Sequence, residues 1–387
     1  MKRLVNTVSG IERRGEMGKR IFVALFSVAV LMSSSIAVLA FNDDRHDDRK
    51  DVVGAVYTMT NDLTGNEVVV FQRDHEGILT KAGSVSTGGL GSGGGFDPLV
   101  SQGSIVLSGD HRWVLAVNAG SDEISVFRVQ PKGLDLVDTV PSGGIFPASV
   151  TVFHDLVYVL NTGGESPNIT GFYLSHTGRL RPLEGSTRSL GSGSFSQVGF
   201  DPHGRRLVVT NRADNLILVY SVGRNGVPVM NAVSSTSNGI APFGLIFDKW
   251  GHLLVVEAVS NAVSSYDIHR DGSLQVISPS VANGQIAACW IAGDPRGNVF
   301  TTNPGTSTIS AYKNKAGKGN LVLLDGMASV GNPLLDLDIT KDGRFLYALA
   351  PMNNAIDMFQ IERDGSLINL GAVAGGLSIF AQGIAVR

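Results

Sequence analysis

Amide side chains recur at matching points along the chain, where they could bind a ligand. Glutamine stands just before or at short apolar runs, and asparagine ends others; the candidates are Gln102, Gln197, Asn118, Asn161, Asn211 and Asn303. An amide donates and accepts hydrogen bonds, which suits hydroxyl-rich ligands such as sugars. The alternative is that the asparagines bond to turn backbone and the glutamines satisfy open strand ends.

Two further residues could do chemistry beside these amides. Glu257 stands where other repeats have asparagine, and Trp290 begins a predicted inner strand. An ionised carboxylate in a mouth is costly unless paired or hydrated, so Glu257 is the candidate catalytic residue. Trp290 could stack on a sugar ring or pack in the core with its indole N–H bonded. No Cys/His cluster has metal-ligand spacing, so we expect no metal site and no cofactor.

The candidates follow a repeat whose clearest copy is residues 200–226. It contains an Asp-Pro-x-Gly turn, an apolar run, an Asn-containing turn and a second alternating run. Second strands end at Asn61, Asn118, Asn161, Asn211, Glu257, Asn303 and Pro351, with spacings of 57, 43, 50, 46, 46 and 48 residues. Short strands with this period are typical of β-propeller blades, which bury their faces on their neighbours. We predict an all-β, seven-bladed propeller of four-stranded antiparallel blades over residues 54–387.

The ends of the repeat predict how the ring closes. Gly54 opens directly on a second strand, and the seventh first strand is the C-terminal run from Gly383 to Val386. The last strand should therefore complete the first blade and remove the sheet edges. The stretch from Gly88 to Gly95 accounts for the long first spacing. It lacks the Lys-Ser/Thr of a phosphate loop and is expected to be a flexible connection.

Residues 1–40 have the pattern of a signal peptide. Lys19 and Arg20 precede an uncharged run that ends in Val-Leu-Ala at residues 38–40, and Met17 could be the true start. A retained membrane anchor is the alternative, since about 20 apolar residues can span a bilayer. Residues 41–53 are predicted to be a charged, solvated linker. We expect a secreted or periplasmic protein with no stable membrane insertion after cleavage.

Charge limits the class of partner. The chain has 31 basic and 34 acidic residues, of which residues 1–40 hold six and two, so their removal leaves a net charge of −7. An acidic surface argues against nucleic acid, because phosphate binding needs clustered Lys and Arg. We expect a monomer that binds a small molecule or a carbohydrate.

The repeat resembles the seven-bladed lactonase-like propellers, which include bacterial 6-phosphogluconolactonase and the fungal carboxymuconate-lactonizing enzyme. The resemblance rests on the Phe-Asp-Pro-x-Gly turn, the strand ending in Asn and the Ser/Asn-x-x-Ile/Val-x-x-Tyr/Phe pattern, and it covers residues 54–387. It implies lactone hydrolysis at the channel mouth. The family's His, Arg and Glu positions hold Ser149, Phe243, Gly244, Cys289, Pro304 and Leu334, and only Glu257 stands where the family has a glutamate.

Two functions remain open from the sequence. The first is an exported lactonase-like hydrolase that acts on a lactone or sugar-derived ligand through Glu257 and nearby amides. The second is a non-catalytic propeller that binds an extracellular glycan or protein. Lactone hydrolysis needs a base for the water and a cation or donors for the oxyanion. The sequence offers no convincing base-plus-cation pair.

Overall fold

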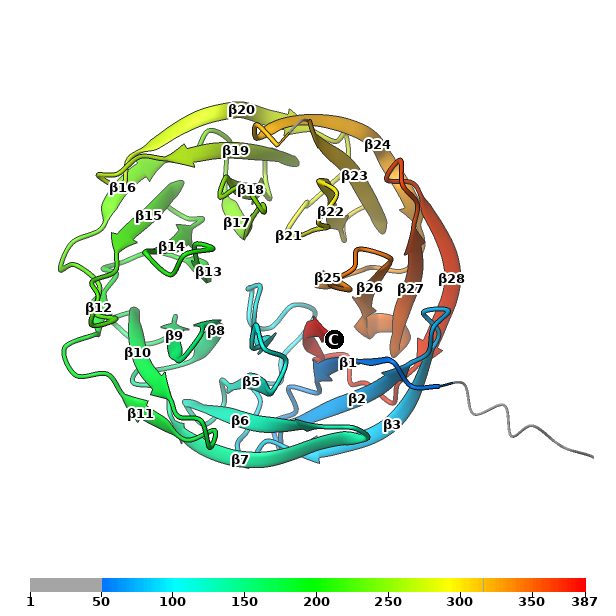
Figure 1. The fold of residues 1–387 in the computed structure, drawn as a ribbon, viewed down its shortest axis with the longest axis horizontal. Helices are drawn as coiled ribbons and strands as arrows, with labels where there is room; N and C mark the ends of the chain where they lie inside the picture. Colours follow the sequence, from blue (N-terminus) through cyan, green and yellow to red (C-terminus); the bar gives the residue numbers. More distant parts are fainter. Residues whose placement is uncertain (1–50, 316) are drawn as a thin grey trace, which may run out of the picture. The chain divides into compact units, whose positions relative to one another are not determined.

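The computed structural model describes residues 51–315 and 317–387. They form seven antiparallel sheets arranged as a ring, with the short first strands near the axis and the long outer strands at the rim (Figure 1). The all-β, seven-bladed prediction is confirmed. The helical content of the described residues is one 3-10 turn, η1 (Pro351–Asn353), and no helix among them is long and apolar enough to cross a membrane. The predicted signal peptide and most of the predicted linker lie outside the described residues.

Each blade is a sheet whose strands follow one another from the axis to the rim. Blade 1 is β29 (Gln382–Val386), β1 (Gly54–Met59), β2 (Glu67–Arg73) and β3 (Leu79–Ser86); blade 2 is β4 (Ile105–Leu107), β5 (Trp113–Asn118), β6 (Glu123–Gln130) and β7 (Gly133–Pro141). Blade 3 is β8 (Pro147–Phe153), β9 (Leu156–Asn161), β10 (Asn168–Leu174), and an outer strand split into β11 (Leu180–Pro182) and β12 (Arg188–Ser189). Blade 4 is β13 (Phe195–Phe200), β14 (Arg206–Asn211), β15 (Leu216–Ser221) and β16 (Val233–Thr236).

The last three blades follow the same order. Blade 5 is β17 (Pro242–Phe247), β18 (Leu253–Glu257), β19 (Ala262–Ile268) and β20 (Leu274–Ala282). Blade 6 is β21 (Trp290–Gly293), β22 (Asn298–Asn303), β23 (Thr308–Lys315) and β24 (Asn320–Val330). Blade 7 is β25 (Leu337–Ile339), β26 (Phe345–Ala350), β27 (Ala355–Ile361) and β28 (Leu367–Ala374).

The second strands show why the sequence forms blades. Runs such as those of β5 and β26 are buried at every residue, because each blade is covered by a neighbour on both faces. The outer strands instead consist mostly of exposed and partly buried residues. Close packing between blades also selects glycine: Gly178 has a φ of 88°, and a Cβ there would lie 2.3 Å from the Trp113 ring of the preceding blade.

The C-terminal strand closes the ring, as the sequence predicts. β29 pairs antiparallel with β1, with Tyr57 opposite Ala385, and the Thr58 hydroxyl donates to the Gly383 carbonyl at 2.6 Å. Blade 1 therefore takes three strands from the start of the described chain and one from its end. Within the described residues, this closure joins the first blade to the last along the ring.

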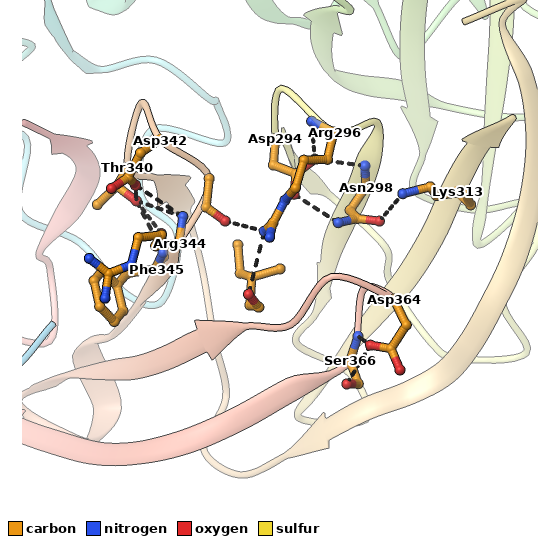
Figure 2. A network of polar contacts seen from close by, with 12 residues as sticks. Asp294, Arg296, Asn298, Lys313, Thr340, Asp342, Arg344, Phe345, Asp364 and Ser366 are labelled. Atoms are coloured by element: carbon orange, nitrogen blue, oxygen red, sulfur yellow. Dashed lines mark hydrogen bonds and ion pairs between the residues drawn. The ribbon is translucent and has the colours of Figure 1, made fainter. Parts of the chain in front are cut away.

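Antiparallel alternation places the turns on two opposite faces of the ring. The blade-to-blade connections and the turns between second and third strands lie on one face, which we call the connection face. The turns between first and second strands and between third and fourth strands lie on the other face, which we call the charged face. Figure 2 shows how blades 6 and 7 are linked on the charged face, where Arg296 bonds Asp294 and reaches the Gly343 carbonyl of the next blade.

Candidate functional site

The central channel contains a cavity of about 410 Å³ that lies toward the charged face. Its wall is formed by the inner strands β4, β17, β21, β25 and β29, together with Gln102 and Gln197. Four ionisable side chains line it: His111, Asp336, Asp338 and Lys341. The cavity thus combines possible proton acceptors with a cation.

The two acids come from one inner strand segment. Asp336 and Asp338 alternate with apolar residues, so both lie on the channel side. Asp338 accepts hydrogen bonds from the backbone N–H groups of Ile339 and Val386, each at 2.8 Å. Asp336 accepts one from Leu337 at 2.9 Å and is also approached by the Gly103 N–H. Two carboxyl oxygens can make more hydrogen bonds than these, so Asp336 retains capacity to bind a ligand.

The two acids both have a raised pKa, and burial is the main cause for each. It raises the pKa of Asp336 well above the usual range, and the negative charge of Asp338 raises it further. Burial raises the pKa of Asp338 to about 6, against opposing hydrogen bonds from the Ile339 and Val386 amides. An ionised Asp338 therefore favours a proton on Asp336. Two carboxyl groups with separated pKa values can serve as acid and base in one site.

The charged-face end of the cavity carries the two other ionisable groups. His111 lies in the turn between β4 and β5 with a φ of 59°, and Lys341 lies in the turn between β25 and β26. Burial lowers the pKa of His111, and the positive charges of Lys341 and Arg387 lower it further. A neutral imidazole is a competent proton acceptor, and Lys341 is an exposed cation beside it.

The two predicted glutamines do line this cavity. Gln102 pairs with the backbone of Ile291 like a strand residue, donating to its carbonyl at 2.8 Å and accepting from its N–H at 3.1 Å. Gln197 accepts from the N–H of Leu245 at 2.6 Å. The Gln197 Nε2 has no hydrogen-bond partner in residues 51–315 and 317–387. It is therefore a donor available to a ligand in the cavity.

The predicted flexible connection, residues 88–95, is instead hydrogen-bonded to a turn of the connection face: Gly91 donates to the Asp62 carbonyl at 2.8 Å and Gly93 to the Asn61 carbonyl at 3.0 Å. The residues that follow it are packed into the channel. Residues 96–103, which we call the plug, close the channel at the connection face through contacts with several blades. Ser101 donates to the Ala148 carbonyl at 2.7 Å, and Trp290 donates from its indole N–H to the Ser101 carbonyl at 2.9 Å. Gln382 donates to Asp97 at 2.8 Å. Because this end is closed, the cavity is reached from the charged face.

Trp290 is buried and in contact with the plug. This side chain is 1% exposed and packs edge-to-face on Phe243 with ring centroids 5.3 Å apart. Together with the hydrogen bond to Ser101, this contact matches the core-packing alternative for Trp290. Asp97 in the plug has a pKa raised to about 7, chiefly by burial.

The predicted asparagines lie under the connection-face turns, away from the cavity lining. Asn118 accepts from Asn66 at 3.0 Å and donates to Ser125 at 2.8 Å, and Asn303 donates to Ser310 at 2.8 Å. Asn161 donates to Asn168, and Asn211 donates to Asp214. All four are buried and hydrogen-bonded to nearby turn and strand residues, which matches the turn-bonding alternative.

Glu257 occupies the equivalent position in blade 5. It is 0% exposed, and its Oε1 accepts from the Gly239 N–H at 2.7 Å and the Ser264 hydroxyl at 2.6 Å. Its Oε2 accepts from the Ser280 hydroxyl at 2.6 Å. The serine seven residues after Glu257 corresponds to the serines that bond Asn118 and Asn303. Glu257 is therefore not brought together with the residues that line the cavity.

We compared the chain with known proteins in three ways. The family described as "Lactonase, 7-bladed beta-propeller" matches residues 39–195. A 6-phosphogluconolactonase from Serratia proteamaculans is 24% identical over 276 residues, which is 66% of this chain and 80% of that protein. Part of this chain thus matches a family of seven-bladed lactonase propellers, and the described residues have the seven-bladed fold. Asp336, Asp338 and Lys341 lie beyond the part matched by the family.

Solved structures show the same propeller fold. A putative 6-phosphogluconolactonase from Bacteroides fragilis is 17% identical with a TM-score of 0.69, covering 86% of this chain and 98% of that one. A periplasmic gluconolactonase from Pseudomonas aeruginosa is 15% identical with a TM-score of 0.68 and the same coverage. At these identities the likeness concerns the fold, so the site of this propeller has to be judged from its own residues.

Proposed function

We propose that this lactonase-like propeller hydrolyses a small, hydroxyl-rich lactone in its channel cavity. The observation that carries the proposal is the set of His111, Asp336, Asp338 and Lys341 on the wall of one cavity. It supplies the base and the cation that the sequence alone does not reveal. The names of the relatives point to the same class of substrate.

The chemistry follows from the proton affinities of the wall. Asp338, ionised near neutral pH, or neutral His111 takes a proton from water as the water attacks the lactone carbonyl. Asp336, whose raised pKa favours the protonated carboxyl group, or Lys341 donates to the carbonyl oxygen as it gains negative charge. The ring C–O bond then breaks, and the ring oxygen leaves as a hydroxyl after receiving the proton. The Gln197 amide can hold a substrate hydroxyl.

The electrostatics favour a lactone without a phosphate group. A bound phosphate would face Asp338 across a small cavity, and the described lining offers Lys341 at the mouth but no arginine. Arginine is the side chain best suited to bidentate phosphate binding, so a neutral sugar lactone is the better fit.

Export remains part of the proposal and rests on the signal-peptide pattern of residues 1–40. A secreted or periplasmic location would give the enzyme access to lactones outside the cytoplasm. The alternative function is a non-catalytic propeller that binds an extracellular glycan or protein. It is favoured by the plug, which closes the channel at the connection face, where the sequence predicts the ligand.

A lactone panel tests the proposal. The protein from residue 41 onward should open glucono-δ-lactone faster than its 6-phosphate. Whichever of His111→Gln and Asp338→Asn removes the general base should lower kcat/KM by about 100-fold, the usual range for loss of such a group. Glu257→Gln is the matched control and should keep full turnover. No turnover by the intact protein, or a collapse confined to Glu257→Gln, would overturn the channel assignment and favour the binding function or a site at Glu257.

A further inference from the structure

The connection face carries large apolar side chains at the tips of its turns. They come from the turns of several blades and the connections between them: Leu63, Leu90, Phe96, Ile145, Ile240, Val259, Ile286, Met352 and Ile379. Each is between 40% and 62% exposed. Single exposed apolar residues need no explanation, but an array on one face of a ring indicates an interaction surface.

Charge on this face is sparse and mostly of one sign. Within the described residues, its turns and connections contain no lysine and no histidine, and Arg212 is their one basic residue. The acidic residues of the rim are Asp62, Asp122, Glu165 and Asp214, while Asp97 and Asp336 are turned into the channel. The face therefore has an apolar surface with an acidic border.

The plug adds an aromatic side chain to this surface. Asp97 accepts a hydrogen bond from Gln382 of β29, and the preceding Phe96 is 41% exposed. The hydrogen bonds of Ser101 and Gln102 fix the plug in place. Aromatic residues are enriched among those that contribute most to protein interfaces.

We propose that the connection face is a docking surface for a polypeptide whose contact surface is apolar and bordered by Lys and Arg. Charge complementarity selects this occupant. Two copies of this chain would bring acidic rims together, and a lipid surface recruits loops through basic side chains, of which the described turns and connections of this face have one. The surface is separate from the channel cavity, so docking goes beyond the proposed lactonase activity.

The test uses a fluorescent amphipathic peptide of leucine and lysine, with a leucine and glutamate peptide as its charge control. Binding to the protein from residue 41 onward is measured by fluorescence anisotropy. Ile240→Ser with Val259→Ser, and separately Phe96→Ser, should weaken binding of the lysine peptide at least about tenfold. The matched control is Met230→Ser with Val276→Ser, which removes apolar side chains of 74% and 42% exposure from the outer rim.

The expected result is loss of binding in both connection-face variants, no change in the rim variant, and weaker binding of the glutamate peptide. Equal losses in connection-face and rim variants, or no binding by the native protein, would overturn the proposal. So would a concentration-dependent dimer in sedimentation that the Ile240 and Val259 changes abolish, or binding to phosphatidylcholine vesicles that displaces the peptide. Lactone turnover by the Ile240 and Val259 variant should stay at the native level, which separates failure of docking from failure of catalysis.

Discussion

The two faces of the ring are built from the same repeat yet differ in chemistry. The charged face holds all seven histidines of the described residues and most of the basic turn residues, including Arg112, Arg179, Lys249, Arg296 and Lys341. On the connection face, Arg212 is the one basic residue of the described turns and connections, which carry a set of exposed aliphatic tips, and Lys81 of β3 reaches the connection at Gly376. The channel repeats this asymmetry, since it ends in His111 and Lys341 on one face and in the plug on the other.

The difference follows from how each kind of turn satisfies its backbone. On the charged face an aspartate at the turn accepts from nearby N–H groups, as Asp201 does from Arg205 and Arg206, and the remaining turn positions stay polar and solvated. On the connection face a buried Asn or Glu side chain beneath the turn bonds the turn backbone, as Glu257 does when it accepts from the Gly239 N–H. The residues at the tip of the turn can then be apolar. A propeller can thus keep ionisable groups and an apolar surface apart.

The largest effect is expected from removing the strand that joins the two faces. β29 runs from Gln382 at the connection face to Val386 at the charged face, so deletion of residues 382–387 should open the ring. We expect loss of cooperative unfolding, since a domain has only about 5–15 kcal/mol of stability to lose. Circular dichroism during heating measures this. Arg387→Ala keeps the backbone bonds to Ala55 and is the control; an unchanged melting temperature in the deletion would contradict closure.

A smaller but still large effect is expected at Glu257, the buried acceptor of the connection face. Glu257→Ala leaves the Gly239 N–H and two serine hydroxyls without their acceptor and creates a cavity. We expect a loss of about 3 kcal/mol in the free energy of unfolding, measured with urea. Glu257→Gln keeps one acceptor, and the Ser280 hydroxyl can rotate to accept, so it should lose less than about 1 kcal/mol. Equal losses in both variants would mean that the charge itself is needed.

The fold could be predicted because the repeat is local. In each blade, apolar runs predict the strands, and Asp-Gly and Asn residues predict the turns. The regular spacing of the seven strand ends predicts seven blades in a ring. The C-terminal closure followed from counting first strands. The spacing of 57 residues revealed an insertion, but not where it packs, because its partners Ala148, Trp290 and Gln382 lie 47 to 285 residues away.

The candidate site was only partly predictable for related reasons. Asp336 and Asp338 carried a usable signal, since two acids that alternate in an apolar inner strand must share the channel side. His111 carried none, because its turn resembles other histidine-containing turns of the chain and only the fold brings it to the channel. Glu257 and the asparagines were singled out by their period. Their regular spacing reflects the need for a side chain that bonds the turn in each blade. Residues that bond a turn recur more regularly along the chain than residues that contact a ligand.

The two ends of the cavity should give opposite pH dependences of stability. The pKa of Asp338 is about 6 in the folded state and about 3.9 when unfolded, so the folded state binds the extra proton. Its contribution is therefore fully present below about pH 4 and is lost as pH rises through 6, by about 3 kcal/mol in all. Asp336 and Asp97 act in the same direction.

His111 has a lowered pKa, so its contribution is instead lost as pH falls below its unfolded pKa. It faces the charges of Lys341, Arg387 and Asp110. Urea unfolding between pH 4 and pH 7 measures both effects. Asp338→Asn should flatten the fall of stability with rising pH, and His111→Gln should steepen it. Parallel profiles for both variants and the native protein would contradict the electrostatic difference between the cavity interior and its mouth.

The smallest effects are expected among the ion pairs of the charged face, where two similar pairs differ in reach. Arg112 and Arg296 each bond through Nε to the aspartate two residues earlier, at 2.6 and 2.8 Å. The Arg112 pair is 62% and 48% exposed, so Arg112→Ala should change the free energy of unfolding by less than about 0.5 kcal/mol. Arg296 pairs with a fully buried Asp294 and also bonds blade 7, so Arg296→Ala should cost about 1.5 kcal/mol.

Urea unfolding in 1 M salt tests this difference. The loss of stability caused by Arg296→Ala should remain mostly unchanged in salt, because hydrogen bonds to backbone carbonyls are screened less than an exposed ion pair. Equal losses at both arginines would mean that the charged face is stabilised by its local turns alone, and that the links between its blades add nothing.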